Sequence, residues 1–156
     1  MSRFSIETSL NNVVSQGPVS NGGYWPTLFP NETIGIERSG VIINDGNILT
    51  PDDVIPIPGA LEAIRMMRLK GYKVVIFFNE PLISQGLMAP YNVDLTNQRL
   101  MELFGQAGIQ TIEGLLYSTT SMKQDLFSMP NNGMMKKAEK DLKLRFKNGY
   151  FVGDKI

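Results

Sequence analysis

The sequence predicts an α/β domain with a mainly parallel sheet, preceded by an extended N-terminal arm. Strand-like and helix-like segments alternate from residue 33 onward, which is the order of strands joined by crossover helices. The chain has 156 residues, 42% of them hydrophobic, which suffices for one domain and a short appendage. Charged residues are rare in the first 31 positions and common afterwards. We therefore divide the chain into an arm at residues 1–32 and a domain at residues 33–156.

The first half of the domain contains two strands and one helix. A short buried-type strand covers residues 33–36. A helix opens after Ile57-Pro58-Gly59, carries apolar residues at helical spacing as far as Leu69, and ends at Gly71. Residues 73–78 are apolar almost throughout, so we expect them to form a central strand that is covered on both faces.

The second half of the domain continues the alternation. After a loop at residues 79–92, an amphipathic helix is closed by Gly108, and residues 114–118 form a third strand. A helix at residues 134–146 and a last strand at residues 149–152 complete the pattern. The lysines of that helix, expected on its solvated face, are Lys136, Lys137, Lys140 and Lys143.

Composition excludes several classes of chemistry. The chain has 15 basic and 15 acidic side chains, so it lacks the excess positive charge that binds nucleic acids or acidic membranes. It has no cysteine and no histidine, which rules out disulfides, thiol or imidazole catalysis and Cys/His zinc sites. No apolar run approaches the ~20 residues that cross a bilayer. We expect a soluble protein, cytoplasmic or within a viral particle.

The arm is expected to gain its order from a partner. Residues 1–31 carry only two charges and are rich in Ser, Asn, Gly and Pro. Ordering such a segment costs about 1–2 kcal/mol per residue, and few apolar groups offset that cost. A cluster of large apolar side chains near its end suits docking into a groove of a neighbouring subunit. The predicted interface residues are Tyr24, Trp25, Leu28 and Phe29.

Four ordered segments at predicted strand and loop ends resemble a known set of motifs. The segments are Glu37-Arg38-Ser39-Gly40-Val41-Ile42, Phe78-Asn79, Ser128-Met129-Pro130-Asn131-Asn132-Gly133-Met134 and Gly153-Asp154-Lys155. Together they resemble the haloacid-dehalogenase-like (HAD) superfamily, in its histidinol-phosphatase and heptose-bisphosphate-phosphatase branch. The resemblance covers residues 33–156. It implies a Rossmann-like three-layer sandwich without a large cap domain.

The resemblance also implies that the catalytic motifs are degenerate. In the family, one Asp attacks phosphorus and a second Asp serves as acid and base, but here these positions hold Glu37 and Ser39. Phe78 stands for a Thr that donates to the phosphoryl group, and Met129 stands for a Lys that neutralises its charge. A longer nucleophile, a lost acid and a lost clamp would each impair catalysis. Asn79 and Asp154 match the family pattern.

Two hypotheses about function follow. The favoured one is a catalytically inactive, cofactor-free pseudoenzyme, a structural subunit of a larger assembly such as a virion or other protein shell. Its arm would dock on neighbouring subunits. The alternative is a divergent Mg²⁺-dependent phosphatase that acts on a small phosphorylated metabolite. In that case Glu37 attacks, Glu37 and Asp154 hold the metal, and Lys123 or Lys136 replaces the missing lysine. An acid near Ser39 would be needed, and Asp45 is the close candidate.

Overall fold

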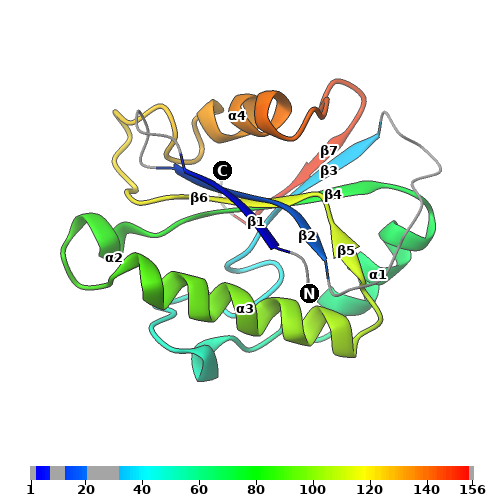
Figure 1. The fold of residues 1–156 in the computed structure, drawn as a ribbon, viewed down its shortest axis with the longest axis horizontal. Coiled ribbons are helices and arrows are strands. Elements are labelled where there is room, and N and C mark those ends of the chain that lie inside the picture. Colours follow the sequence, from blue (N-terminus) through cyan, green and yellow to red (C-terminus); the bar gives the residue numbers. More distant parts are fainter. Residues whose placement is uncertain (1–2, 8–12, 21–31, 155–156) are drawn as a thin grey trace.

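In a computed structural model, the chain folds around a seven-stranded sheet with helices on both faces (Figure 1). The structure describes residues 3–7, 13–20 and 32–154. The strands are β1 (Arg3–Glu7), β2 (Val13–Ser20), β3 (Thr33–Glu37), β4 (Lys73–Asn79), β5 (Thr111–Ile112), β6 (Gly114–Ser118) and β7 (Tyr150–Val152). The helices are α1 (Ala60–Leu69), α2 (Pro81–Ser84), α3 (Pro90–Gln106) and α4 (Gly133–Asp141), with a 3₁₀ turn at Pro51–Asp53.

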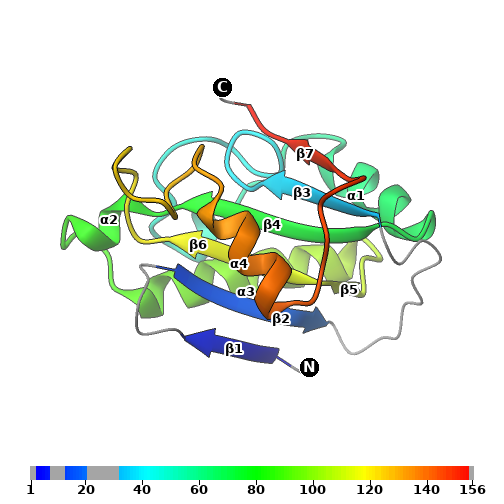
Figure 2. The ribbon, with the colours of Figure 1, turned by 90° about the horizontal axis from the view of Figure 1, so that it is seen from above.

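The sheet is mainly parallel, as predicted. Its order is β1-β2-β6-β4-β3-β7, and β5 also pairs with β2. The four strands β6, β4, β3 and β7 run parallel, whereas β1 and β2 join antiparallel at one edge (Figure 2). Parallel strands joined by helices bring their carboxyl ends to one side of the sheet, and loops from distant parts of the chain meet there.

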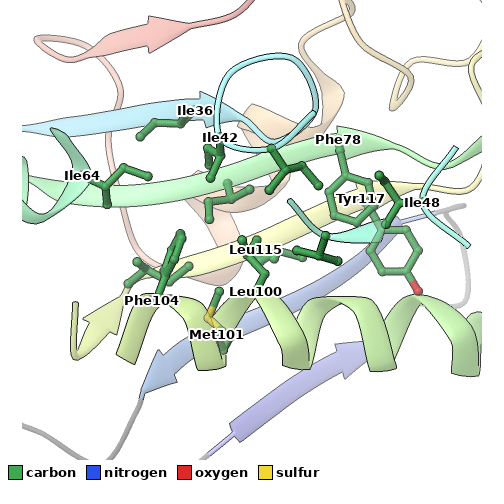
Figure 3. Close-up of a cluster of buried hydrophobic side chains, with 14 of the residues drawn as sticks. Ile36, Ile42, Ile48, Ile64, Phe78, Leu100, Met101, Phe104, Leu115 and Tyr117 are labelled. Atoms are coloured by element: carbon green, nitrogen blue, oxygen red, sulfur yellow. The ribbon is translucent and has the colours of Figure 1, made fainter. Parts of the chain in front are cut away.

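Strand β4 shows why the molecule has three layers. Val74, Ile76 and Phe78 alternate with Val75 and Phe77 along it, and all five side chains are buried. The first set packs into the larger core cluster with α1 and α3 (Figure 3), and the second packs with α4 on the opposite face. The prediction of a central strand that is covered on both faces is confirmed. The part of the chain that the structure describes contains no large cap domain.

Helix α4 differs from its prediction in length and in the face that it presents. It ends at Asp141, and Lys143 adopts a positive φ of 54°, which is incompatible with a helix continuing to residue 146. Lys137, expected in solvent, is 9% exposed and its Nζ lies 2.6 Å from Asp141 Oδ2. The reason is its spacing from Met134 and Ala138, because residues three and four apart share the buried face.

Two strands lie within the predicted arm. Strand β2 pairs antiparallel with β6, so Val13 lies opposite Ser118, and β1 pairs with β2. The breaker signal at Gly17-Pro18 did not predict this, because a shift in the β1–β2 register accommodates the pair as a bulge-like irregularity. The division of the chain at residue 32 stays a prediction. The predicted interface residues Tyr24, Trp25, Leu28 and Phe29 lie outside the described residues.

No helix within residues 32–154, the part of the chain in which the described helices lie, combines the length and the apolar character that crossing a bilayer requires.

Candidate active site

A cleft of about 480 Å³ opens at the carboxyl ends of β3 and β4. Open parallel sheets bind ligands at this edge, so the position alone indicates a functional site. The cleft gathers the end of β3, the loop after it, the end of β4 and the loop before α4. Its described lining residues are Glu37, Arg38, Ser39, Asp45, Gly46, Asn47, Phe78, Asn79, Glu80, Pro81, Ser121, Met129 and Pro130.

The carboxylate of Glu37 is anchored at the junction of β3 and β7. Its Oε2 accepts a hydrogen bond from the backbone amide of Asp154 at 3.2 Å. A Cβ at Gly153 would lie 2.8 Å from the same oxygen, so this close approach depends on glycine. The predicted nucleophile position therefore keeps a carboxylate at the cleft.

The turn after β3 brings Asp154 beside the same strand end. The amide of Gly40 donates to the carbonyl of Ile43 at 2.8 Å, and Gly40 has a φ of +83°. The carboxylate of Asp154 lies directly over the α-carbon of Gly40, where a Cβ would collide with it. Asp154 thus joins the site through Glu37 and Gly40. Lys155, the last residue of that motif, lies outside the described residues.

Asn79 ties the end of β4 to the loop that precedes α4. Its side-chain Nδ2 donates to the carbonyl of Met129 at 3.1 Å, and its Oδ1 accepts from the amide of Met129 at 3.0 Å. The amide side chain therefore serves to position the loop. Met129 itself is partly buried, and its side chain packs against the core cluster beside α4.

Phe78 is part of the core as well as of the cleft. It is 1% exposed, and its ring stacks on that of Tyr117 with centroids 5.1 Å apart and planes inclined at 16° (Figure 3). The large ring is therefore supported from below by a second ring.

Arg38 is the residue that sequence reasoning missed. It is 3% exposed, and the carbon of its guanidinium lies 3.5 Å from the centroid of the Phe78 ring. Its Nη2 lies 3.7 Å from Glu80 Oε2, and its Nε and Nη2 each lie 3.4 Å from the hydroxyl oxygen of Ser39, to which they donate. The ion-pair partner of Arg38 is therefore Glu80.

Burial governs the protonation of this pair. Burial lowers the pKa of Arg38 to about 10, although the nearby carboxylate of Glu80 opposes that shift. Burial also raises the pKa of Glu80, against the opposing effects of Arg38 and of the Leu82 amide. Arg38 is therefore a charged side chain at neutral pH.

The remaining charged residues that the sequence proposed for the site are Asp45, Lys123 and Lys136. Asp45 lines the cleft, and its Oδ1 accepts from the amide of Gly46 at 3.0 Å. Lys123 and Lys136 are both exposed, and neither is a lining residue. Among the described residues that line the cleft, Arg38 is the one basic side chain.

The donor set fits Mg²⁺ only in a limited way. Glu37 and Asp154 place two carboxylates at adjacent strand ends, and the carbonyl of Ser39 lies in the turn between Glu37 and Gly40. Residues 3–7, 13–20 and 32–154 contain no cluster of three or more acidic side chains that could hold a metal. Since Mg²⁺ is commonly bound by one or two carboxylates together with water and substrate phosphate, these residues suit a weakly held ion.

The fold and the cleft define a class of protein: a Rossmann-like α/β domain in which loops meet at the carboxyl ends of the parallel strands. No model of a protein family matches the chain. It is 29% identical over 125 residues to the D-glycero-β-D-manno-heptose-1,7-bisphosphate 7-phosphatase of Pseudomonas aeruginosa, which covers 78% of this chain and 69% of that protein. The Pseudomonas putida enzyme of the same name is 25% identical over 122 residues, 76% of this chain and 69% of that protein.

Solved structures share the fold. A HAD-like phosphatase structure from Mesorhizobium loti superposes with a TM-score of 0.78 at 22% identity, over 95% of this chain and 73% of that one. The D,D-heptose 1,7-bisphosphate phosphatase of B. bronchiseptica, complexed with magnesium and phosphate, gives a TM-score of 0.72 at 20% identity, over 79% and 70%. The resemblance to the HAD superfamily, in its heptose-bisphosphate phosphatase branch, is confirmed: the chain is similar in sequence to two heptose-bisphosphate phosphatases and shares its fold with HAD-like phosphatase structures.

These relatives overturn the favoured hypothesis on function. The expectation of an inactive structural subunit of a virion or other shell is wrong, because the relatives in sequence are named phosphatases. That hypothesis was based on the catalytic side chains missing from each motif. The structure places the guanidinium of Arg38 in the cleft, which that hypothesis did not consider, together with the carboxylate of Asp45, which the alternative had named.

Proposed function

We propose that this protein is a divergent phosphatase that hydrolyses a small phosphorylated metabolite. One observation carries the proposal: the cleft at the ends of β3 and β4 combines a carboxylate from Glu37 with a guanidinium from Arg38 and a further carboxylate from Asp45. The kinship with named phosphatases supports the same activity. A cytoplasmic location stays a prediction.

Glu37 is the nucleophile in this proposal. One of its carboxylate oxygens attacks phosphorus, the bond between phosphorus and the ester oxygen breaks, and an acyl phosphate forms on the side chain. The alcohol leaves with a proton from Asp45 or from water. Water then attacks the acyl phosphate, Asp45 or solvent takes up the released proton, and inorganic phosphate and the free carboxylate of Glu37 are restored.

Two residues limit how the reaction is assisted. Ser39 supplies a hydroxyl where a carboxylic acid would protonate the leaving group, so Asp45 takes that role in the proposal. Glu37 and Asp154, with the Ser39 carbonyl, would hold Mg²⁺, which supplies neutralisation of phosphoryl charge when it is bound. The hydrogen bond between the Asp154 amide and Glu37 orients the carboxylate whether or not a metal is present.

The test is phosphate release by the purified full chain with Mg²⁺ present. Substrates are heptose 1,7-bisphosphate, which the names of the relatives suggest, other small sugar phosphates, and nitrophenyl phosphate. We expect Glu37→Gln to lower turnover at least 100-fold, because a group of this kind is typically worth that much. The matched control is Glu102→Gln on the exposed side of α3, which should leave turnover unchanged.

Mass spectrometry of acid-quenched protein adds a second readout. A phosphoryl group on Glu37 during turnover is expected. Turnover that survives Glu37→Gln, or no turnover on any of these esters with folded protein, would overturn the proposal.

A further inference from the structure

The cleft has an unusual charge balance for a site that receives phosphate. Its described lining side chains include the carboxylates of Glu37, Asp45 and Glu80, and one cation, Arg38. A phosphate ester brings further negative charge to this acidic surface. Like charges at close range repel, so a binding site of this kind needs a cation that can approach the phosphate oxygens.

The contacts of Arg38 with the protein are long. Charge-assisted hydrogen bonds between a guanidinium and a carboxylate are usually about 2.7–2.9 Å long. Here the distance from Arg38 to Glu80 is 3.7 Å, and the two contacts with the Ser39 hydroxyl are 3.4 Å each. The protein thus balances the charge of Arg38 without satisfying its donors at short range.

The orientation of the guanidinium suits an incoming oxyanion. Its central carbon lies over the Phe78 ring, 3.5 Å from the centroid, and this cation–π contact leaves the N–H groups of the guanidinium unused. Tyr117 stacks on that ring with the two centroids 5.1 Å apart. The fork of N–H donors on a guanidinium matches two oxygens of one phosphate group.

We propose that Arg38 is the oxyanion-binding side chain of the cleft and that the phosphate of the substrate takes the place near it that Glu80 holds in this structure. Phe78 is then the platform that orients the guanidinium. The inference rests on the proposed function in one respect, that the anion is the phosphate of a substrate.

The experiment measures binding of inorganic phosphate to the full chain by titration calorimetry, with and without Mg²⁺. We expect Arg38→Met to weaken binding at least about tenfold, because a charge-assisted bidentate contact is lost. Arg99→Met on the exposed side of α3 is the matched control and should bind as the parent does. Glu80→Gln should bind phosphate several-fold more tightly, because a competing carboxylate is removed.

Circular dichroism shows whether Arg38→Met is folded. If it is not, the phosphate affinity of Glu80→Gln tests the inference instead. Arg38→Lys is a further variant, since it keeps the charge and loses the fork, and intermediate affinity is expected. Equal affinity in Arg38→Met and Arg99→Met, or unchanged or weaker binding in Glu80→Gln, would overturn the inference.

The two proposals fail in different ways. Phosphate binding that depends on Arg38, without turnover of any ester, supports this inference and overturns the phosphatase. Turnover that depends on Glu37 while Arg38→Met keeps its affinity and its KM supports the phosphatase and overturns this inference.

Discussion

The sheet carries an arginine–glutamate pair with a buried guanidinium at each end, and the two pairs are built differently. At the amino ends of the strands, Arg68 donates to the Tyr72 carbonyl at 2.7 Å, to Glu113 Oε2 at 3.0 Å and to the Thr111 hydroxyl at 2.9 Å. The carboxylate of Glu113 also accepts from the Val74 amide at 3.0 Å. At the carboxyl ends, the pair of Arg38 and Glu80 is 3.7 Å apart and borders the cleft.

Comparing the two pairs shows that burial of an arginine does not by itself tell whether its ion pair stabilises the fold. Arg38 and Arg68 are 3% and 2% exposed, so exposure alone does not tell them apart. Short hydrogen bonds to the backbone make the Arg68–Glu113 pair a closed clamp that joins α1 to the start of β4 and β6. The Arg38–Glu80 pair lacks such bonds and faces a cavity, which makes it an open pair that another anion can enter.

The largest effect is expected from Glu113→Gln, which breaks the closed clamp. The carboxylate accepts from both Arg68 and the Val74 amide, and the amide of Gln leaves one of these donors without an acceptor, which costs about 1–3 kcal/mol. We expect a loss of about 3 kcal/mol in the free energy of unfolding, measured by denaturant titration. The double variant Arg68→Met with Glu113→Leu should recover most of that loss. A loss under about 1 kcal/mol in the single variant would show that the clamp is not structural.

The next effect is expected from Phe78→Thr, which removes the platform of the open pair. The ring is fully buried and contacts both Arg38 and Tyr117, so losing its volume should cost roughly 3 kcal/mol. Tyr91→Thr is the matched control, because Tyr91 is 68% exposed and should tolerate the change. Thermal unfolding of both variants gives the measurement. Similar melting temperatures for the two variants would contradict a packed Phe78.

A smaller effect on stability is expected from Glu80→Gln in the open pair. Because Arg38 lines the cleft, water can approach it after the substitution, and we expect a loss of about 1 kcal/mol or less. The same denaturant titration as for Glu113→Gln gives the comparison. A loss as large as that of Glu113→Gln would mean that both pairs are closed clamps.

The smallest effect is a pH dependence of the closed clamp. Burial raises the pKa of Glu113 in the folded state, against the opposing effects of Arg68 and the Val74 amide. The folded state therefore binds this proton more tightly than the unfolded state does. The contribution of that titration to stability is complete below the ordinary pKa of 4.5 and is lost as the pH rises through the raised value.

Comparing parent and Glu113→Gln across pH measures this dependence. The advantage of the parent in unfolding free energy should shrink as the pH rises from below the ordinary pKa of 4.5 to neutrality. An advantage that grows with pH would mean that the ionised carboxylate is the favoured form in the folded protein.

Local pattern predicted most of the fold. The strand at residues 114–118 was predicted with its observed bounds, and Gly71 and Gly108 end their helices with positive φ as expected. Those features depend on neighbours in sequence. Strand β2 depends instead on pairing with β6, about a hundred residues away. The Gly-Pro dipeptide within β2 predicts a turn, but an irregularity in the register with β1 accommodates it.

The site was predictable in position and only partly in chemistry. The strand ends that carry Glu37, Phe78 and Asn79 do meet at one cleft, because parallel strands place their carboxyl ends together. The partner of Arg38 was not predictable. Glu80 lies more than forty residues further along the chain, and only the adjacency of β3 and β4 brings the two side chains together.

The two hydrogen bonds of Asn79 have a consequence for how this site can change over time. They mimic a pair of peptide groups, one donor and one acceptor, and they grip the main chain of residue 129 and not its side chain. These two bonds therefore do not depend on which side chain residue 129 carries. A lysine at this position can be replaced by methionine while both hydrogen bonds to the main chain are kept. The charge of the cleft can therefore change without loss of the contact that anchors the loop.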